Sequence, residues 1–145
     1  RSIEQEKIPL LGICFGHQII AQALGGKVEK FSGGWSVGLK EYKWGNESIH
    51  LNAWHQDQVV KKPKKAKVLA ENSFCKYAAL SYGDTILTTQ PHPEFTHEVI
   101  KGLIETRGKG RVPEHLLDEA LNNFEKKTSL NEIVAKFSSV LNGAR

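Results

Sequence analysis

A cysteine flanked by glycines, at the junction of two apolar segments, constrains the fold of this chain more than any other feature. Residues 8–13 (IPLLGI) have the apolar character of a strand buried on both faces. Apolar residues at helical spacing follow in residues 19–24, and Gly25-Gly26 predicts the end of that helix. Residues 12–16 (GICFG) must therefore turn a strand into a helix within a few positions, which predicts an α/β fold.

The same junction has the arrangement of a nucleophile elbow, with Cys14 in place of the serine. The sharp turn predicts backbone strain at Cys14. Glycine is expected at positions 12 and 16, because a side chain at either position would clash within the turn. The sulfur would lie at the positive end of the helix, which favours the thiolate over the thiol. The backbone N–H of Phe15 would be free to donate to an oxyanion. A buried structural cysteine in a strand–helix turn is the alternative.

A histidine and a carboxylate follow a second apolar segment. Residues 90–95 (QPHPEF) come directly after the apolar residues 86–89 of an expected strand. Pro93 restricts His92 to extended backbone, so the side chains of His92 and Glu94 are expected to face the same side. The carboxylate could then hold the imidazole in the tautomer that leaves its other nitrogen free as a base. A surface turn with an incidental His and Glu is the alternative.

A third polar segment, residues 53–58 (AWHQDQ), follows an expected strand at residues 48–52. Its side chains are too varied for a packing face, so it is interpreted as a loop that contacts a substrate. Trp54, His55 and Gln56 are its candidate residues. A loop histidine with structural partners is the other interpretation.

The remaining pattern predicts short strands followed by helices. Strands at residues 37–44 and 48–52 are joined by a Gly45-Asn46 turn as a hairpin, and shorter strands are expected at residues 67–70 and 77–82. Helical spacing marks residues 98–105, 114–126 and 129–141, the last with Ser129 and Glu132 as a capping box.

Composition and charge exclude several classes of protein. With 25% charged and 39% hydrophobic residues the chain is an ordinary globular one, and no apolar run reaches the roughly 18 residues of a membrane span. Its two cysteines, Cys14 and Cys75, form no disulfide scaffold, so a reducing, cytoplasmic compartment is the default. Cys75 has neither basic neighbours nor a helix start and is expected to be a packed thiol.

Charge and spacing also bear on ligands. The net charge of +4 is concentrated in the lysines of residues 61–67, either a phosphate-binding patch or a solvated loop. No aromatic residue or arginine interleaves these lysines, so no nucleic acid partner is expected. His92, Glu94 and His97 are close in sequence but lack the H-E-x-x-H spacing, and no phosphate-binding glycine pattern follows a strand. Neither a metal nor a cofactor is predicted.

Together, GICFGHQ, WHQDQ and QPHPEF resemble the class I, triad-type glutamine amidotransferases, most closely the stand-alone relatives of the GMP synthase glutaminase domain. The resemblance covers residues 9–106. It implies an open, mostly parallel sheet with flanking helices, of the flavodoxin-like kind. It also implies that Cys14 is the nucleophile and that His92 and Glu94 complete a triad. Gln18 would help hold the substrate, and Trp54, His55 and Gln56 would line the amino-acid end of the pocket.

The function implied is hydrolysis of the glutamine side-chain amide through a thioester, releasing ammonia for an acceptor. The substrate would be L-glutamine or another γ-glutamyl compound, and an ammonia-accepting synthase would be a separate chain. A γ-glutamyl peptide hydrolase with the same triad is one alternative. A non-catalytic partner-binding or regulatory domain is another.

The resemblance also predicts the domain organisation. Residues 1–112 would be the C-terminal portion of the amidotransferase domain, and residues 113–145 a helical extension. Family members carry an α/β half before the elbow that supplies sheet strands and a second oxyanion donor. This chain is therefore expected to be part of a longer protein.

Overall fold

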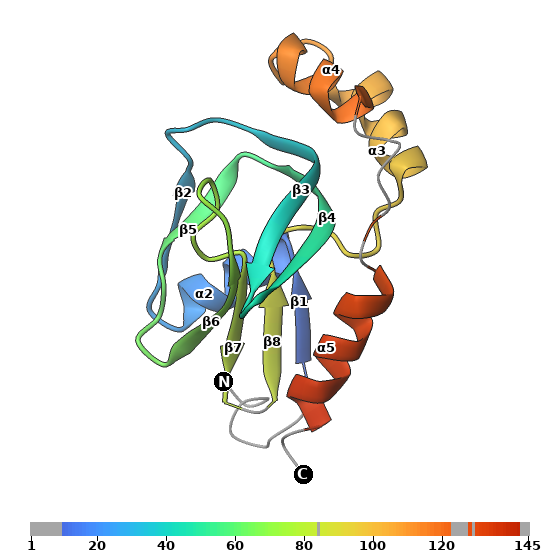
Figure 1. Cartoon of the computed structure of the whole chain (residues 1–145). Helices are drawn as coiled ribbons and strands as arrows, with labels where there is room; N and C mark the ends of the chain where they lie inside the picture. The colour runs from blue at the N-terminus through green and yellow to red at the C-terminus, as the bar shows by residue number, and fades with distance from the viewer. Residues whose placement is uncertain (1–9, 84, 123–127, 129, 143–145) are drawn as a thin grey trace.

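The computed structural model describes residues 10–83, 85–122, 128 and 130–142 (Figure 1). The strands are β1 (Leu10–Ile13), β2 (Lys27–Lys30), β3 (Ser36–Trp44), β4 (Glu47–His55), β5 (Asp57–Lys61), β6 (Ala66–Glu71), β7 (Ala79–Tyr82) and β8 (Ile86–Thr89). The helices are α2 (Phe15–Ala23), α3 (His97–Leu103), α4 (Glu114–Asn122) and α5 (Leu130–Asn142), with a π-helical turn η1 (Ile104–Gly108) after α3. None of the helices described is long and apolar enough to cross a membrane.

The described strands form a six-stranded sheet in the order β1-β8-β7-β6-β3-β4 and a separate β2-β5 pair. Only β1 and β8 pair in parallel, with Leu10 opposite Ile86 and Ile13 opposite Thr89. The other pairs are antiparallel. The expectation of a mostly parallel sheet is therefore wrong for the described strands. Short turns join β3 to β4 and β7 to β8, and parallel pairing would need a crossover of a dozen or more residues.

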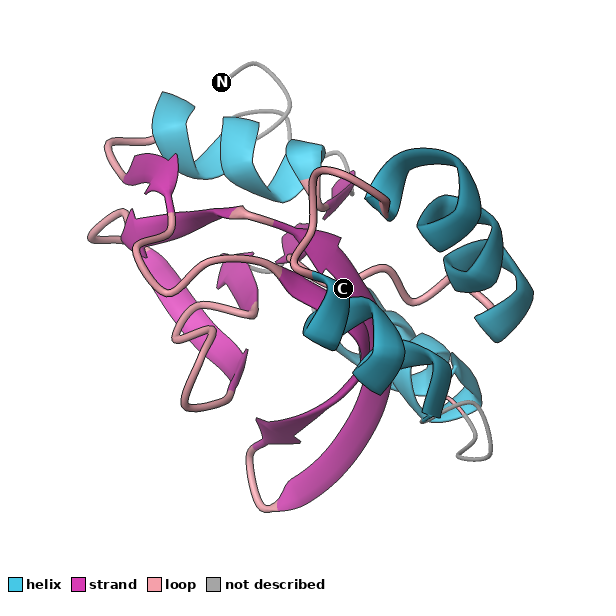
Figure 2. Cartoon of the chain, turned by 90° about the horizontal axis from the view of Figure 1, so that it is seen from above, coloured by secondary structure: helices cyan, strands magenta, loops and turns pink. Residues whose placement is uncertain are grey.

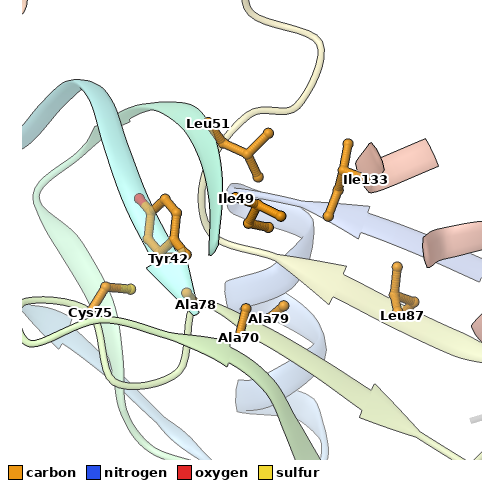
Figure 3. Packing of buried hydrophobic residues seen from close by; sticks show 9 residues of the cluster. All are labelled: Tyr42, Ile49, Leu51, Ala70, Cys75, Ala78, Ala79, Leu87 and Ile133. Atoms are coloured by element: carbon orange, nitrogen blue, oxygen red, sulfur yellow. The ribbon is translucent and has the colours of Figure 1, made fainter. Parts of the chain in front are cut away.

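The central strands are buried on both faces because helices cover both (Figures 1 and 2). On one face, Ile86 and Tyr82 pack with Ile20 of α2. On the other face, Leu87 packs with Ile133 of α5. Ile86 and Leu87 point to opposite faces, as adjacent strand residues must. The hydrophobic cluster that contains Leu87 and Ile133 comprises Tyr42, Ile49, Leu51, Ala70, Cys75, Ala78, Ala79, Leu87 and Ile133 (Figure 3).

β1 differs from its expected environment. It was predicted to be buried on both faces, but among the described strands it lies at the edge of the sheet and pairs with β8 alone. Leu11 is 42% exposed, and Phe15 and Ile19 at the start of α2 are also exposed. An edge strand has one neighbour, so apolar character alone did not determine its burial.

The β3–β4 hairpin reaches well beyond the sheet and carries a second group of helices (Figure 1). Val37 of β3 packs with Ile100 of α3, with Ile104 of η1 and with Leu117 of α4. Trp35 and Trp54 lie against this cluster, with their ring centroids 6.2 Å apart and nearly edge to face. These helices therefore support the end of the hairpin that carries Trp54 and His55.

Most predicted elements are present. The hairpin with its Gly45-Asn46 turn and the strands of β6, β7 and β8 are confirmed within two residues, except that β4 ends at His55, three residues beyond its predicted end. The loop predicted at residues 53–58 is wrong, because β4 continues through His55 and β5 begins at Asp57. The predictions for Ile8, Pro9 and Ser129 lie outside the described residues.

The proposed boundary at residue 112 stays a prediction. Beyond it, α4 contributes Leu117 and Ala120 to the helical cluster, and α5 contributes Ile133 to the sheet core.

The lysine segment forms the turn between β5 and β6, where Lys62 Nζ donates to the carbonyl of Ala66 at 3.0 Å.

Replacing Gly38 should destabilise the contact between β3 and α4. Gly38 has φ +86°, and a Cβ there would lie 2.6 Å from Cβ of Ala120. Strain costs about 1–2 kcal/mol and overpacking about 1–3 kcal/mol, so G38A should lower the free energy of unfolding by about 2–5 kcal/mol in urea denaturation. Gly45 also has positive φ, +62°, but open space around it. G45A should cost only about 1–2 kcal/mol. Equal losses would show that the close approach to Ala120 is not limiting.

Candidate active site

The β1–α2 junction forms a strained turn at Cys14. Cys14 has φ 52° and ψ −97°, and among the described residues it is the one non-glycine with positive φ. Its N–H donates to the carbonyl of Thr89 at 2.7 Å, and its carbonyl accepts from the N–H of Gln18 at 3.0 Å. These bonds to β8 and α2 hold the turn in a conformation that an isolated peptide avoids.

The two glycines of the junction are not equivalent. A Cβ on Gly12 would lie 2.9 Å from Cδ1 of Ile20 and 3.1 Å from the backbone carbon of Gly16. A Cβ on Gly16 would meet nothing within 4 Å. The close approach of α2 to β1 therefore requires Gly12, and the expected clash at Gly16 is absent.

The Cys14 thiol is less acidic than its position at a helix start predicts. The pKa of Cys14 is raised from 9.0 to about 11, mainly by burial and also by the charges of Glu94 and Asp57, while hydrogen bonds from Gln90 and from the Phe15 N–H oppose the increase. The net increase corresponds to about 3 kcal/mol, whereas a helix N-terminus contributes only about 0.3–1 kcal/mol. Desolvation therefore dominates, and the resting sulfur is a thiol rather than the predicted thiolate.

A chain of side-chain amides connects the sulfur to α2 and β5. Gln90 Nε2 donates to Cys14 Sγ at 3.5 Å. Gln18 Nε2 donates to Gln90 Oε1 at 3.2 Å and to the backbone carbonyl of Asp57 at 3.0 Å. Gln18 was predicted to hold a substrate, and here its amide nitrogen is used within the protein. Gln90 is fully buried and was not predicted as a site residue, although it opens the QPHPEF segment.

His92 and Glu94 meet as their spacing predicts. His92 Nδ1 lies 2.9 Å from Glu94 Oε2. The backbone N–H of His92 donates to the carbonyl of Asn52 at 2.9 Å, and its ring stacks on Phe95 with centroids 3.8 Å apart. Because the carboxylate occupies Nδ1, Nε2 is the nitrogen left for proton transfer. The sulfur's side-chain partner is Gln90 rather than His92, and catalytic hydrogen bonds often form only when substrate binds.

An open pocket of about 300 Å³ adjoins the sulfur. Its lining residues are Cys14, Phe15, Gln18, Trp35, Trp54, His55, Gln56 and Asp57. The pocket thus joins the elbow to the predicted residues of the third segment, whereas His92 and Glu94 are not among its lining residues. Trp35 and Asp57 were not predicted. No sequence signal marked Trp35, while Asp57 lies next to the predicted Gln56.

Two histidines, His17 in α2 and His55 in the pocket lining, are buried. His17 is fully buried, and its Nδ1 lies 2.7 Å from Thr88 Oγ1. Burial lowers the pKa of His17 to about 3 and that of His55 to about 4, so both rings are neutral at pH 7. Over the described part of the chain, no three metal-ligating side chains gather into a site. Cys75 is 2% exposed within the sheet core, which confirms that it is a packed thiol.

Comparison with known proteins gives a consistent picture. The family model for glutamine amidotransferase class-I matches residues 1–106. The chain is 31% identical to gamma-glutamyl peptidase 2 of Arabidopsis thaliana over 87% of this chain and 56% of that protein. It is 30% identical to a glutamine-hydrolyzing GMP synthase of Thermus thermophilus over 90% of this chain and 29% of that protein.

A solved structure shares the fold. A glutamine amidotransferase from Thermotoga maritima aligns with a TM-score of 0.73 at 21% identity, covering 97% of this chain and 65% of that one. The chain spans about half the length of the gamma-glutamyl peptidase that it matches.

Alanine substitutions at Gly12 and Gly16 should have different effects on stability. G12A should lower the free energy of unfolding by about 1–3 kcal/mol, because α2 must move away from β1. G16A should leave it unchanged or raise it by up to about 1 kcal/mol, because alanine favours the helix and has room. Urea denaturation of both variants checks this. A larger loss in G16A would contradict the packing described here.

His17 should make the fold sensitive to acid. The pKa of His17 is about 3 in the folded protein and about 6.5 in the unfolded chain. Below pH 6.5 the unfolded chain therefore binds more protons, and the free energy of unfolding decreases as the pH is lowered. The loss attributable to His17 reaches roughly 5 kcal/mol below both pKa values. H17Q should flatten the dependence between about pH 6.5 and 3 in urea denaturation. An unchanged slope would mean that His17 is protonated in the folded state.

Proposed function

The chain belongs to the class I glutamine amidotransferase family, and from this premise we propose that it hydrolyses the side-chain amide of glutamine. Cys14 is the nucleophile, His92 the proton-transferring base and acid, and Glu94 the group that orients His92. The observation that carries the proposal is the parallel pairing of β1 with β8. Because the two strands are parallel, their carboxyl ends lie at the same end of the sheet. Cys14 follows one of these strands and the His92–Glu94 pair follows the other.

The proposed reaction begins with the protonated sulfur. His92 Nε2 takes the proton of Cys14 as Sγ attacks the amide carbon, and the N–H of Phe15 donates to the developing oxyanion. The tetrahedral intermediate collapses as the carbon–nitrogen bond breaks, and His92 delivers its proton to the leaving ammonia. His92 then deprotonates a water molecule that attacks the thioester, and glutamate leaves as Sγ regains a proton.

Electrostatics support this division of roles. A resting thiol with a pKa of about 11 needs a base at the moment of attack. The charge of Glu94 contributes to the raised pKa of Cys14, which supports a role for the His92–Glu94 pair near the sulfur. The proposal assigns Gln18, Trp54, His55 and Gln56 to substrate binding. Of these, His55 is a buried residue of the pocket lining, and its neutral ring can accept a bond at one nitrogen and donate one at the other.

Hydrolysis of γ-glutamyl peptides is a second candidate. The gamma-glutamyl peptidases among the matched relatives favour it. The pocket is open and is lined by the Trp35 and Trp54 rings, which leaves room for an amide substituent larger than ammonia. With glutamine as the substrate, the released ammonia would pass to an acceptor on another chain or segment.

Covalent labelling tests the nucleophile and the pocket together. A glutamine-like chloroketone should form a single adduct on Cys14, mapped by peptide mass spectrometry, and excess glutamine should block it. C14A should abolish both labelling and ammonia release from glutamine. C75A should retain labelling at Cys14, because Cys75 lies in the sheet core.

The outcomes separate the candidates. Protection by a γ-glutamyl dipeptide but not by glutamine would favour the peptidase. Labelling of Cys75 in place of Cys14 would contradict the triad. A folded sample with no adduct at all would favour a non-catalytic, partner-binding role.

A further inference from the structure

We propose that Gln90 is a further catalytic residue, whose side-chain amide holds the Cys14 sulfur while Gln18 fixes the orientation of that amide. The proposal rests on Cys14 being the nucleophile of the function proposed above. It adds a residue that the sequence did not single out, and it gives Gln18 a positioning role in addition to any contact with substrate.

The direction of the hydrogen bonds follows from the backbone. The carbonyl of Asp57 can only accept, so the Gln18 atom that lies 3.0 Å from it is the amide nitrogen. The second hydrogen on that nitrogen is donated to Gln90 at 3.2 Å, so the Gln90 atom that receives it is the oxygen. The atom of Gln90 that lies 3.5 Å from Cys14 Sγ is therefore its nitrogen, a donor.

The position of Gln90 is fixed by its surroundings. Its side chain is completely buried, and its backbone N–H donates to the carbonyl of Ala78 at 2.7 Å. The next residue, Pro91, has a restricted φ, and its carbonyl accepts from Thr89 Oγ1 at 2.9 Å. A buried amide in a fixed place retains its partners, because leaving a donor unpaired is costly. The Cys14 sulfur is thus held in one orientation beside the pocket.

The amide also acts on the charge of the sulfur. A donor bonded to a thiolate gains strength as the charge forms. It opposes the three influences that disfavour the thiolate, which are burial, the carboxylate of Glu94 and the carboxylate of Asp57. Together with the Phe15 N–H, Gln90 is one of the two hydrogen-bond donors that lower the pKa of Cys14.

The reactivity of Cys14 toward iodoacetamide, followed by peptide mass spectrometry across a pH series, tests this without any substrate. Q90M keeps the volume and removes the donor. The pKa of Cys14 should rise by about one pH unit, giving about tenfold less thiolate near pH 8. A more basic thiolate is intrinsically about threefold more reactive, so alkylation should slow by about threefold.

A matched control comes from the β2-β5 pair. Gln58 in β5 is also buried, at 2% exposed, and does not line the pocket. Q58M should leave the alkylation profile of Cys14 unchanged. Equal slowing in Q58M and Q90M would overturn the proposal, since a general loss of packing would then explain both.

A second substitution guards against misfolding of Q90M. Q90E keeps an acceptor for Gln18 but offers no donor to sulfur when ionised, and it adds a negative charge beside Cys14. Its alkylation should be slower than that of Q90M. Alkylation of folded Q90E at the wild-type rate would overturn the proposal.

The role of Gln18 is tested by combining variants. Q18M should slow alkylation of Cys14 by less than Q90M does, and the double variant should match Q90M, because Gln18 acts through Gln90. Additive effects would show that Gln18 does not position Gln90.

The chloroketone experiment distinguishes this proposal from the proposed function. If glutamine fails to protect Cys14 from the chloroketone while the variants still slow alkylation as expected, the glutaminase function is rejected but the role of Gln90 stands.

Discussion

The parallel pairing of β1 with β8 is the interaction on which the site depends. It places the N–H of Cys14 against the carbonyl of Thr89 at 2.7 Å and so brings two segments 76 residues apart to one edge of the sheet. Residues that end neighbouring parallel strands share an edge, where polar side chains can meet. The backbone bond that holds the Cys14 elbow and the contact of Gln90 with its sulfur both depend on this register, and the His92–Glu94 pair follows β8 directly in the sequence.

The helices on both faces give that register its stability. Ile20 of α2 and Ile133 of α5 pack on opposite faces of the sheet. Burial that stabilises the strands also desolvates the site, so Cys14 stays a thiol and His17 and His55 stay neutral. The same packing therefore sets both the fold and the protonation states from which the proposed chemistry starts.

The local sequence predicted structure correctly where the backbone restrictions of neighbouring residues determine the conformation. Pro93 between His92 and Glu94 predicted the pair that the structure places 2.9 Å apart. The Gly45-Asn46 turn predicted the β3–β4 hairpin. The interpretation of residues 53–58 as a loop was wrong because the pairing of β4 with β3 continues through His55 opposite Ser36, a contact that no local pattern encodes.

The sequence by itself therefore determined the strand–helix junction at Cys14, the stiff His92–Glu94 pair and the family. Only the tertiary structure decided that the sheet is mixed, that Gly12 rather than Gly16 permits the close approach of α2, and that the Cys14 thiol is less acidic than a helix start suggests. It alone showed Gln90 bonded to the sulfur. These properties depend on burial and on partners far away in the chain, whereas turns, caps and proline restrictions act between neighbours.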